Sequence, residues 1–110
     1  MYRTAEPDHV HGYETCTSYA SGHIHYMFGT TGNEVQTGTN HVHYLQGKTT
    51  IDNGHAHCYR GVTGPAIYLP NGDHIHRFCG VTTIDHCHSH AYNASTSYSI
   101  YRHLFNAAYR

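Results

Sequence analysis

The chain has 110 residues, a formal net charge of −1 with neutral histidine, and a single lysine, Lys48. This length predicts one domain, and the lack of a basic excess argues against a nucleic-acid partner. No stretch is long and apolar enough for a transmembrane helix. Residues 1–8 contain no apolar run, so we expect the chain to be made without a signal peptide.

The 14 histidines follow a repeat. Six His-x-His pairs succeed one another at steps that alternate between 14 and 18 or 19 residues. Two consecutive pairs make one unit, and the units begin at His9, His41 and His74. Aligned positions outside the pairs include Val35, Ile67 and Ile100. A fixed period of this size is typical of a repeat protein, so we assign 9–94 to a repeat domain.

The chain is predicted to begin with an N-terminal arm, residues 1–8. In the first unit, the pair at His9 begins a strand that leads into a Thr/Ser-rich strand at 17–20. Ser21-Gly22 forms a turn before a strand at 23–28, and a weak strand is expected at 34–37. Alternate residues on a strand share a face, so the two histidines of each pair point the same way.

The second and third units repeat this plan. Asn53-Gly54 predicts a tight hairpin, because a type I′ turn needs positive φ at both central residues. In the third unit, His86-Cys87 stands at this position. Residues 95–110 are predicted to form a strand near 97–101 and then an irregular or helical end, and to contact neighbouring subunits.

The pattern along the His strands predicts the fold. Two residues after each pair stands a large apolar or aromatic residue: Tyr13, Met27, Leu45, Tyr59, Phe78 and Tyr92. The residue between the two histidines is apolar in five of the six pairs. Both faces of each His strand therefore have to be shielded from water. We predict an all-β fold of three repeats of about 32 residues, each with about four short antiparallel strands. A sandwich-like stack is expected, with a trefoil-like barrel as the alternative.

The paired histidines predict metal binding. Neutral imidazole is the commonest metal ligand in proteins and suits Cu, Zn and Ni. The predicted ligands are His9, His11, His23, His25, His41, His43, His55, His57, His74, His76, His86, Cys87, His88 and His90. Within this set, the run from His86 to His90 is the densest candidate site. The rival interpretation is a ladder of histidines that hydrogen-bond to each other and to threonines.

Two aspartates occupy equivalent positions in the repeat. Asp52 and Asp85 could orient an imidazole from outside the coordination shell, although an Asp before Asn53-Gly54 also favours a turn. The four cysteines fit neither CxxC nor a zinc ribbon, so disulfides, metal ligation and simple half-buried packing all stay open. No nucleophile motif or pair of catalytic carboxylates stands out, so we predict that the chain is not an enzyme.

The repeated His-x-His pairs occur together with Thr49-Thr50-Ile51-Asp52 and Asn53-Gly54-His55-Ala56-His57. In these motifs the chain resembles the YmaF family, small proteins of spore-forming and related bacteria. The resemblance covers about residues 9–92. It implies a bacterial setting and a surface or spore association. The His86-Cys87 turn and the tyrosine-rich end after Asn93 depart from the family pattern.

The near-zero charge and the apolar residues on both strand faces predict self-association. We therefore expect a His-rich metal-binding structural protein that assembles with copies of itself into a filament or coat, outside the cell or on the spore surface. The alternative is a soluble metal-buffering protein in the cytoplasm, and a small metalloenzyme is a weaker third hypothesis.

Overall fold

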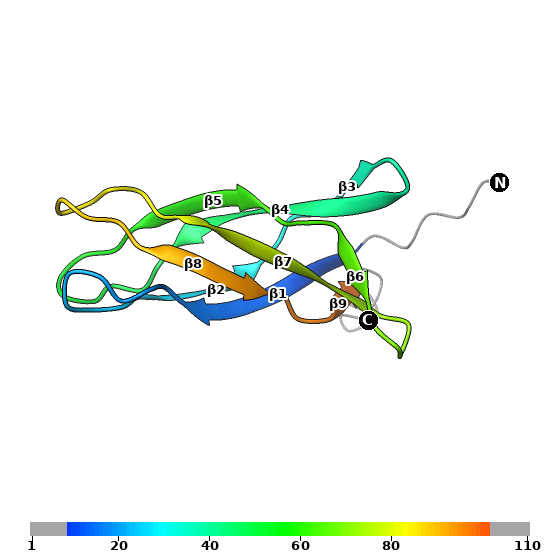
Figure 1. Cartoon of the computed structure of the whole chain (residues 1–110), viewed down its shortest axis with the longest axis horizontal. Helices are drawn as coiled ribbons and strands as arrows, with labels where there is room; N and C mark the ends of the chain where they lie inside the picture. The colour runs from blue at the N-terminus through cyan, green and yellow to red at the C-terminus, as the bar shows by residue number, and fades with distance from the viewer. Residues whose placement is uncertain (1–8, 102–110) are drawn as a thin grey trace, which may run out of the picture.

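The computed structural model describes residues 9–101, and all regular secondary structure in this range is β-strand. The strands are β1 (His9–Cys16), β2 (Tyr26–Thr30), β3 (Glu34–Thr37), β4 (Asn40–Lys48), β5 (Cys58–Val62), β6 (Ala66–Tyr68), β7 (His74–Val81), β8 (Ala91–Ser95) and β9 (Ser99–Tyr101). They form three antiparallel sheets of three strands, in the orders β2-β1-β9, β3-β4-β5 and β6-β7-β8 (Figure 1). The all-β prediction is confirmed, and the sheets do not close into a barrel.

Each sheet is built on one long strand, β1, β4 or β7, that has two partners. The first half of the long strand pairs with a short strand, and its second half pairs with β2, β5 or β8. The short-strand pairings have one register, with Val10 opposite Ile100, Val42 opposite Val35, and Ile75 opposite Ile67. The three aligned positions of the sequence repeat therefore occupy the same structural place.

The strand β9 closes the three sheets into a ring of repeats. β3 and β6 reach the following long strands through short loops, whereas β9 comes from the third repeat and pairs with β1 of the first. The strand expected near 97–101 is therefore β9, and it pairs within its own chain. His9 lies opposite Tyr101, so the two ends of the described range are neighbours. The predicted arm, 1–8, and residues 102–110 lie outside the described residues.

The described chain has nine strands rather than about twelve, because the expected threonine strands do not form full ladders. Thr17 donates its backbone N–H to the carbonyl of His25, but the N–H of His25 donates to Oγ1 of Thr17 instead of to a backbone carbonyl. Only an isolated bridge remains at each hairpin tip. The tips turn with positive φ, as at Asn53 (55°) and Gly54 (79°), which confirms the type I′ expectation.

The hydrophobic core lies along the middle of the molecule. It consists of the six positions that follow the His pairs, namely Tyr13, Met27, Leu45, Tyr59, Phe78 and Tyr92, all at most 6% exposed. Each core tyrosine lies across a glycine on the paired strand, as Tyr59 does opposite Gly47. A Cβ at Gly47 would lie 2.6 Å from the Tyr59 hydroxyl oxygen, so only glycine leaves room for this ring. Tyr13 and Tyr59 join their hydroxyls by a 2.8 Å hydrogen bond.

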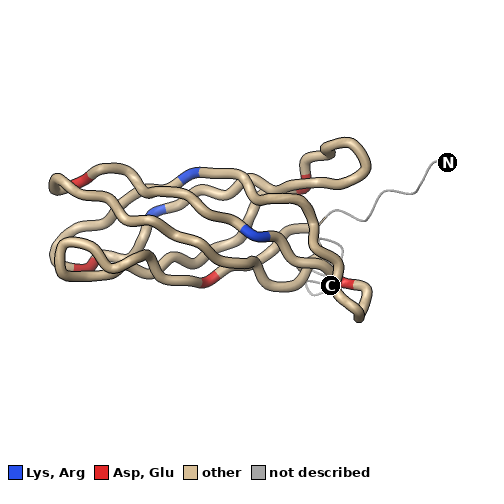
Figure 2. The backbone as a smooth tube through the Cα atoms, in the orientation of Figure 1, with Lys and Arg blue, Asp and Glu red and all other residues tan. Residues whose placement is uncertain are grey.

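The surface of the described range carries many apolar side chains and few charges. Tyr19, Ile51 and Ile84 stand at equivalent positions of the three repeats and are each 76% exposed. The four cysteines are free and exposed. Basic residues lie along the middle of the long axis, and acidic residues gather mainly toward its two ends (Figure 2). Residues 9–101 contain no helix that could cross a membrane.

Candidate metal centres

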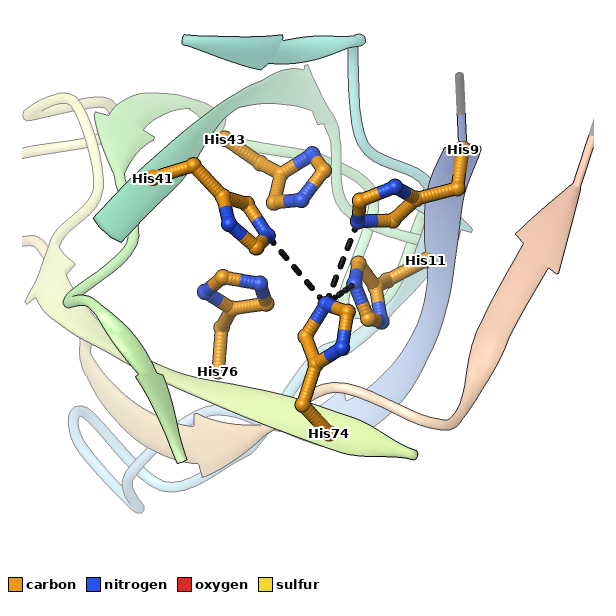
Figure 3. Close-up of side chains that lie close together, drawn as sticks. All are labelled: His9, His11, His41, His43, His74 and His76. Atoms are coloured by element: carbon orange, nitrogen blue, oxygen red, sulfur yellow. Dashed lines mark hydrogen bonds between the residues drawn. The ribbon is translucent and has the colours of Figure 1, made fainter. Parts of the chain in front are cut away.

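Twelve of the histidines gather into two clusters, one on each side of the hydrophobic core. The base cluster comes from the first halves of β1, β4 and β7 and consists of His9, His11, His41, His43, His74 and His76 (Figure 3). The tip cluster comes from the hairpins and consists of His23, His25, His55, His57, His88 and His90. Each repeat contributes one His-x-His pair to each cluster. The pseudo-threefold arrangement of the sheets therefore builds both clusters.

The base cluster is buried and compact. Its six side chains are at most 6% exposed, and one ring nitrogen of each lies within 4.8 Å of the corresponding nitrogen of all the others. Nε2 of His74 lies 3.1 Å from Nε2 of His9 and of His11, and 3.2 Å from Nε2 of His41. The six nitrogens therefore surround one small volume.

The tip cluster has the same design but is more exposed at its outer end. His25, His57 and His90 are at most 1% exposed, whereas His23, His55 and His88 are half-buried. Ring nitrogens of five members lie within 4.8 Å of one another. His55 joins them, because its Nε2 lies 3.2 Å from Nε2 of His88.

Hydrogen bonds fix the tautomer of the inner ring in each pair. Nδ1 of His11, His43 and His76 lies 2.8–2.9 Å from a backbone carbonyl, and Nδ1 of His25, His57 and His90 lies 2.8–3.0 Å from another. A carbonyl only accepts hydrogen bonds, so each of these Nδ1 atoms carries the proton and donates it. The Nε2 atom of each ring is then left with a lone pair, the form in which imidazole binds a metal ion.

The Nε2 lone pairs of these rings converge, and most of them accept no hydrogen bond from the described residues. Nε2 of His25, His43, His57, His76 and His90, together with that of His23, is buried and has no hydrogen-bond partner within the described structure. A buried polar atom without a partner carries a penalty of about 1–3 kcal/mol. An ion at the centre would satisfy all of these nitrogens at once, so the clusters could each hold a metal ion.

Six buried threonines link the histidines of successive repeats into rings. Thr31 holds His11 by two hydrogen bonds, donating its N–H to the His11 carbonyl and accepting the His11 N–H on Oγ1. The next carbonyl, that of Gly32, accepts the proton of Nδ1 of His43. Thr63 continues the ring by holding His43 and presenting the carbonyl of Gly64 to His76.

Thr96 completes this ring, because it holds His76 and presents the carbonyl of Ser97 to His11. The tip cluster has an equivalent ring built from Thr17, Thr49 and Thr82. Each threonine thus fixes the backbone of one histidine, and the residue after it orients the imidazole of the next. Such outer hydrogen bonds orient metal ligands and raise their basicity.

We expect Thr63→Val to destabilise the protein and weaken its hold on metal. Valine keeps the shape of the side chain, but the buried N–H of His43 loses its acceptor, which costs about 1–3 kcal/mol. Loosening His43 and the carbonyl that orients His76 should lower metal affinity by roughly 10–100-fold. Metal titration followed by calorimetry measures this change. Thr39→Val, on the exposed loop before β4, is the matched control and should leave affinity unchanged.

Burial keeps the inner base rings neutral. Desolvation lowers the pKa of His11 to about 3 and those of His43 and His76 to about 4, although their carbonyl hydrogen bonds act in the opposite direction. Neighbouring imidazoles lower these pKa values further. Desolvation also lowers the pKa of His57 and His90 at the tip. At neutral pH these rings are therefore in their metal-binding form.

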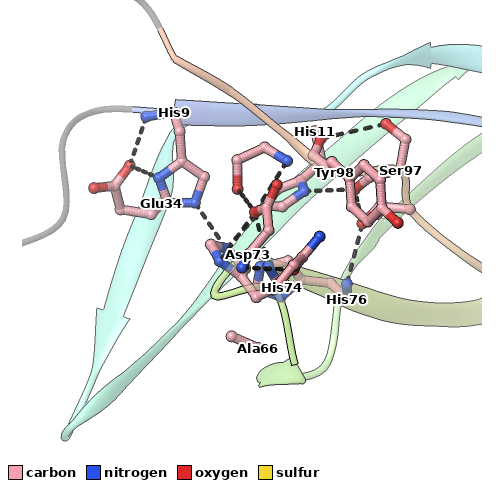
Figure 4. A network of polar contacts seen from close by, with 12 residues as sticks. His9, His11, Glu34, Ala66, Asp73, His74, His76, Ser97 and Tyr98 are labelled. Carbon is pink, nitrogen blue, oxygen red and sulfur yellow. Dashed lines mark hydrogen bonds and ion pairs between the residues drawn. The ribbon is translucent and has the colours of Figure 1, made fainter. Parts of the chain in front are cut away.

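Two carboxylates stand beside each cluster. At the tip, Asp52 and Asp85 each place an oxygen 3.3 Å from Nδ1 of His25 and His57 respectively. At the base, Glu34 lies 3.6 Å from Nδ1 of His9, and Asp73 lies 3.8 Å from Nδ1 of His74 (Figure 4).

Hydrogen bonds keep two of these carboxylates ionised. Burial tends to raise the pKa of Asp73, but hydrogen bonds from Ser99 and from the N–H of His74 outweigh it, so the pKa is lowered. A hydrogen bond from Thr83, with the neighbouring His57, lowers the pKa of Asp85. Both clusters therefore have anionic charge at the positions that polarise imidazole ligands.

The structure separates the dense run in the third repeat. His88 and His90 enter the tip cluster, whereas His86 and Cys87 form the turn, with φ of 54° and 68°, and are exposed. The ring of His86 stacks on that of His55 at 4.5 Å, outside the cluster. Asp52 and Asp85 each lie 3.3 Å from Nδ1 of a tip-cluster histidine, and their orienting role stays a prediction. Sequence reasoning missed Glu34, Asp73 and the six threonines, although the threonines recur in the repeat register as Thr17, Thr49 and Thr82, and as Thr31, Thr63 and Thr96.

Comparison with known proteins identifies the family. The family model described as "YmaF: Spore germination protein GerY/YamF" matches residues 6–98, so the chain belongs to the YmaF family. Neither the curated proteins nor the solved structures give a significant match.

Proposed function

We propose that this YmaF-family chain is a non-enzymatic structural protein in which bound metal ions join the three repeats, and which assembles with copies of itself. The observation that carries the proposal is the convergence of Nε2 lone pairs whose Nδ1 atoms are already committed to carbonyls. Because each cluster takes a histidine pair from every repeat, an ion in it ties all three sheets together. Binding to the folded state alone stabilises that state.

The burial of the base cluster supports a structural role over catalysis or metal buffering. A catalytic ion needs an open coordination position that a substrate can reach. The six base rings leave no exposed approach, since His9, His11, His43 and His76 are 0% exposed. A buffering protein must release its ion readily, which a core position would slow.

The surface supports self-assembly. Exposed apolar side chains recur at equivalent positions of the repeats, and a domain of near-zero net charge has little repulsion between copies. Segments 1–8 and 102–110 are joined in sequence to His9 and Tyr101, which are paired with each other. We propose that they add to a sheet edge of a neighbouring copy, a head-to-tail contact that builds a filament.

The description of the family supports a bacterial and spore-related setting. We propose that the filament or coat lies outside the cell or on the spore surface. A cytoplasmic metal-buffering monomer is the alternative, and the size of the particle in solution distinguishes the two.

The test compares the metal-loaded full chain with chains lacking residues 1–8 or 102–110, by size-exclusion chromatography and electron microscopy. We expect filaments from the full chain, and monomers that still bind metal from the truncated chains. Both truncations keep β9, which the ring needs. A full chain that stays monomeric at high concentration would overturn self-assembly. Fibres from a chain lacking both segments would place the contact in the repeats.

A further inference from the structure

We infer that each cluster is a six-coordinate, all-imidazole site for one divalent ion of octahedral preference, with Ni²⁺ as the best-fitting ion, so that the chain binds two ions. This inference rests on the proposed metal binding and specifies its coordination number, stoichiometry and metal class. It is carried by the mutual arrangement of the rings, the separations of their nitrogens and the charge around them.

The base rings stand at the corners of an octahedron. An octahedron has three pairs of opposite corners, and all its other corner pairs are adjacent. In the base cluster the opposite rings are His9 and His76, His11 and His41, and His43 and His74 (Figure 3). All other pairs of these rings have centroids 4.5–5.2 Å apart.

The tip rings repeat this arrangement. Here the opposite rings are His23 and His57, His25 and His88, and His55 and His90. All other pairs have centroids 4.8–5.0 Å apart. His55 is therefore the sixth corner of the tip cluster, and a site of five ligands would leave that corner unexplained.

The nitrogen separations fit six-coordination. The edge of an octahedron is longer than the metal–ligand distance by the square root of two. Edges of 3.1–3.2 Å between Nε2 atoms thus correspond to a metal–nitrogen distance of about 2.2 Å, close to those of imidazole complexes. Opposite nitrogens would then be about 4.4 Å apart, within the 4.8 Å limit of the base cluster.

The charge around each cluster fits a divalent ion. Six neutral imidazoles leave an M²⁺ ion with its full charge, and a buried uncompensated charge is unfavourable. Two carboxylates stand beside the Nδ1 atoms of each cluster, Glu34 and Asp73 at the base and Asp52 and Asp85 at the tip. At the base and at the tip alike, the two negative charges of the carboxylates would balance the two positive charges of the ion.

A set of six equivalent imidazole donors favours some of the divalent ions that imidazole binds over others. Zn²⁺ in structural sites is almost always four-coordinate, and Cu²⁺ prefers a tetragonal arrangement with unequal bonds. The threonine rings hold the inner histidines at equivalent positions and oppose both distortions. High-spin octahedral Ni²⁺ is a d⁸ ion without the Jahn–Teller distortion of Cu²⁺, so it accepts six equal nitrogen donors. It also binds nitrogen sites more tightly than Fe²⁺ or Co²⁺.

The test uses the full chain, unfolded, stripped of metal and refolded with Ni²⁺, with Zn²⁺ or with an equimolar mixture. We expect two nickel ions per chain by elemental analysis, six nitrogen neighbours by X-ray absorption, and at least tenfold more bound nickel than zinc from the mixture. In His55→Gln, we expect one nickel ion per chain to be lost to a chelator at least tenfold faster than from the wild type. Thr39→Val, on the exposed loop before β4, is the control and should release nickel at the wild-type rate.

Four nitrogen neighbours around nickel, or more bound zinc than nickel from the mixture, would overturn the six-coordinate assignment while leaving metal binding intact. Equal release from the two variants would show that His55 is not a ligand. A chain that binds neither ion would overturn the proposed function itself.

Discussion

Removing the metal ions should lower the melting temperature by roughly 30 °C or more, because each cluster loses the ion that joins its six rings. A ligand present at 1,000 times its dissociation constant stabilises the folded state by about 4 kcal/mol, so two such sites contribute roughly 8 kcal/mol. A domain of this size shifts its melting temperature by about 4–8 °C per kcal/mol. Since typical folding free energies are about 5–15 kcal/mol, the stripped chain is left marginally stable.

Scanning calorimetry before and after chelation at pH 7 measures this shift, and restoring the ions should restore the melting temperature. An unchanged melting temperature after complete removal of metal would mean that the histidines form a hydrogen-bonded ladder, as in the rival interpretation of the sequence. The 3.1–3.2 Å separations between Nε2 atoms would then be hydrogen bonds rather than corners of a coordination sphere.

Acidification should unfold the metal-free chain between about pH 6.5 and pH 4. The pKa of His11 is lowered to about 3 and those of His43 and His76 to about 4 in the folded chain, whereas histidine in an unfolded chain has a pKa of about 6.5. In this window the unfolded state binds more protons, so stability falls as the pH falls. Each such ring contributes a slope of about 1.4 kcal/mol per pH unit when it titrates only in the unfolded state.

Urea unfolding at a series of pH values measures this slope with and without bound metal. Three rings acting together would remove most of a typical folding free energy within roughly two pH units. Bound metal should move the loss to lower pH, because protons must displace the ion. A free energy of unfolding that does not change between pH 7 and pH 4.5 would contradict neutral burial of these rings.

The repeat was predictable because the same residue types recur at the same positions of each unit. His-x-His, the large residue that follows it and the Asn53-Gly54 turn each have a direct geometric meaning on a strand, so the all-β fold and the candidate ligands follow from them. The strand near 97–101 was found by register alone, since Ile100 aligns with Val35 and Ile67.

The division of the ligands was not predictable, because it depends on which repeats meet in space. Sequence spacing placed His86, Cys87, His88 and His90 together, but the tight turn separates them. His9 and His74 are 65 residues apart and lie 3.1 Å from each other at Nε2. The threonine pattern was visible, but nothing local shows that Oγ1 of Thr63 replaces a carbonyl in the ladder.

The pairing of β9 with β1 predicts that this repeat protein folds more cooperatively than a linear repeat array. In a linear array each repeat contacts only its neighbours, so stability accumulates unit by unit and part of the array can stay folded. Here the last repeat supplies the strand that the first one lacks, and both histidine clusters take side chains from all three repeats. A chain shortened by one repeat would have neither the closed ring of sheets nor complete histidine clusters. We therefore expect the three repeats to fold as one cooperative unit.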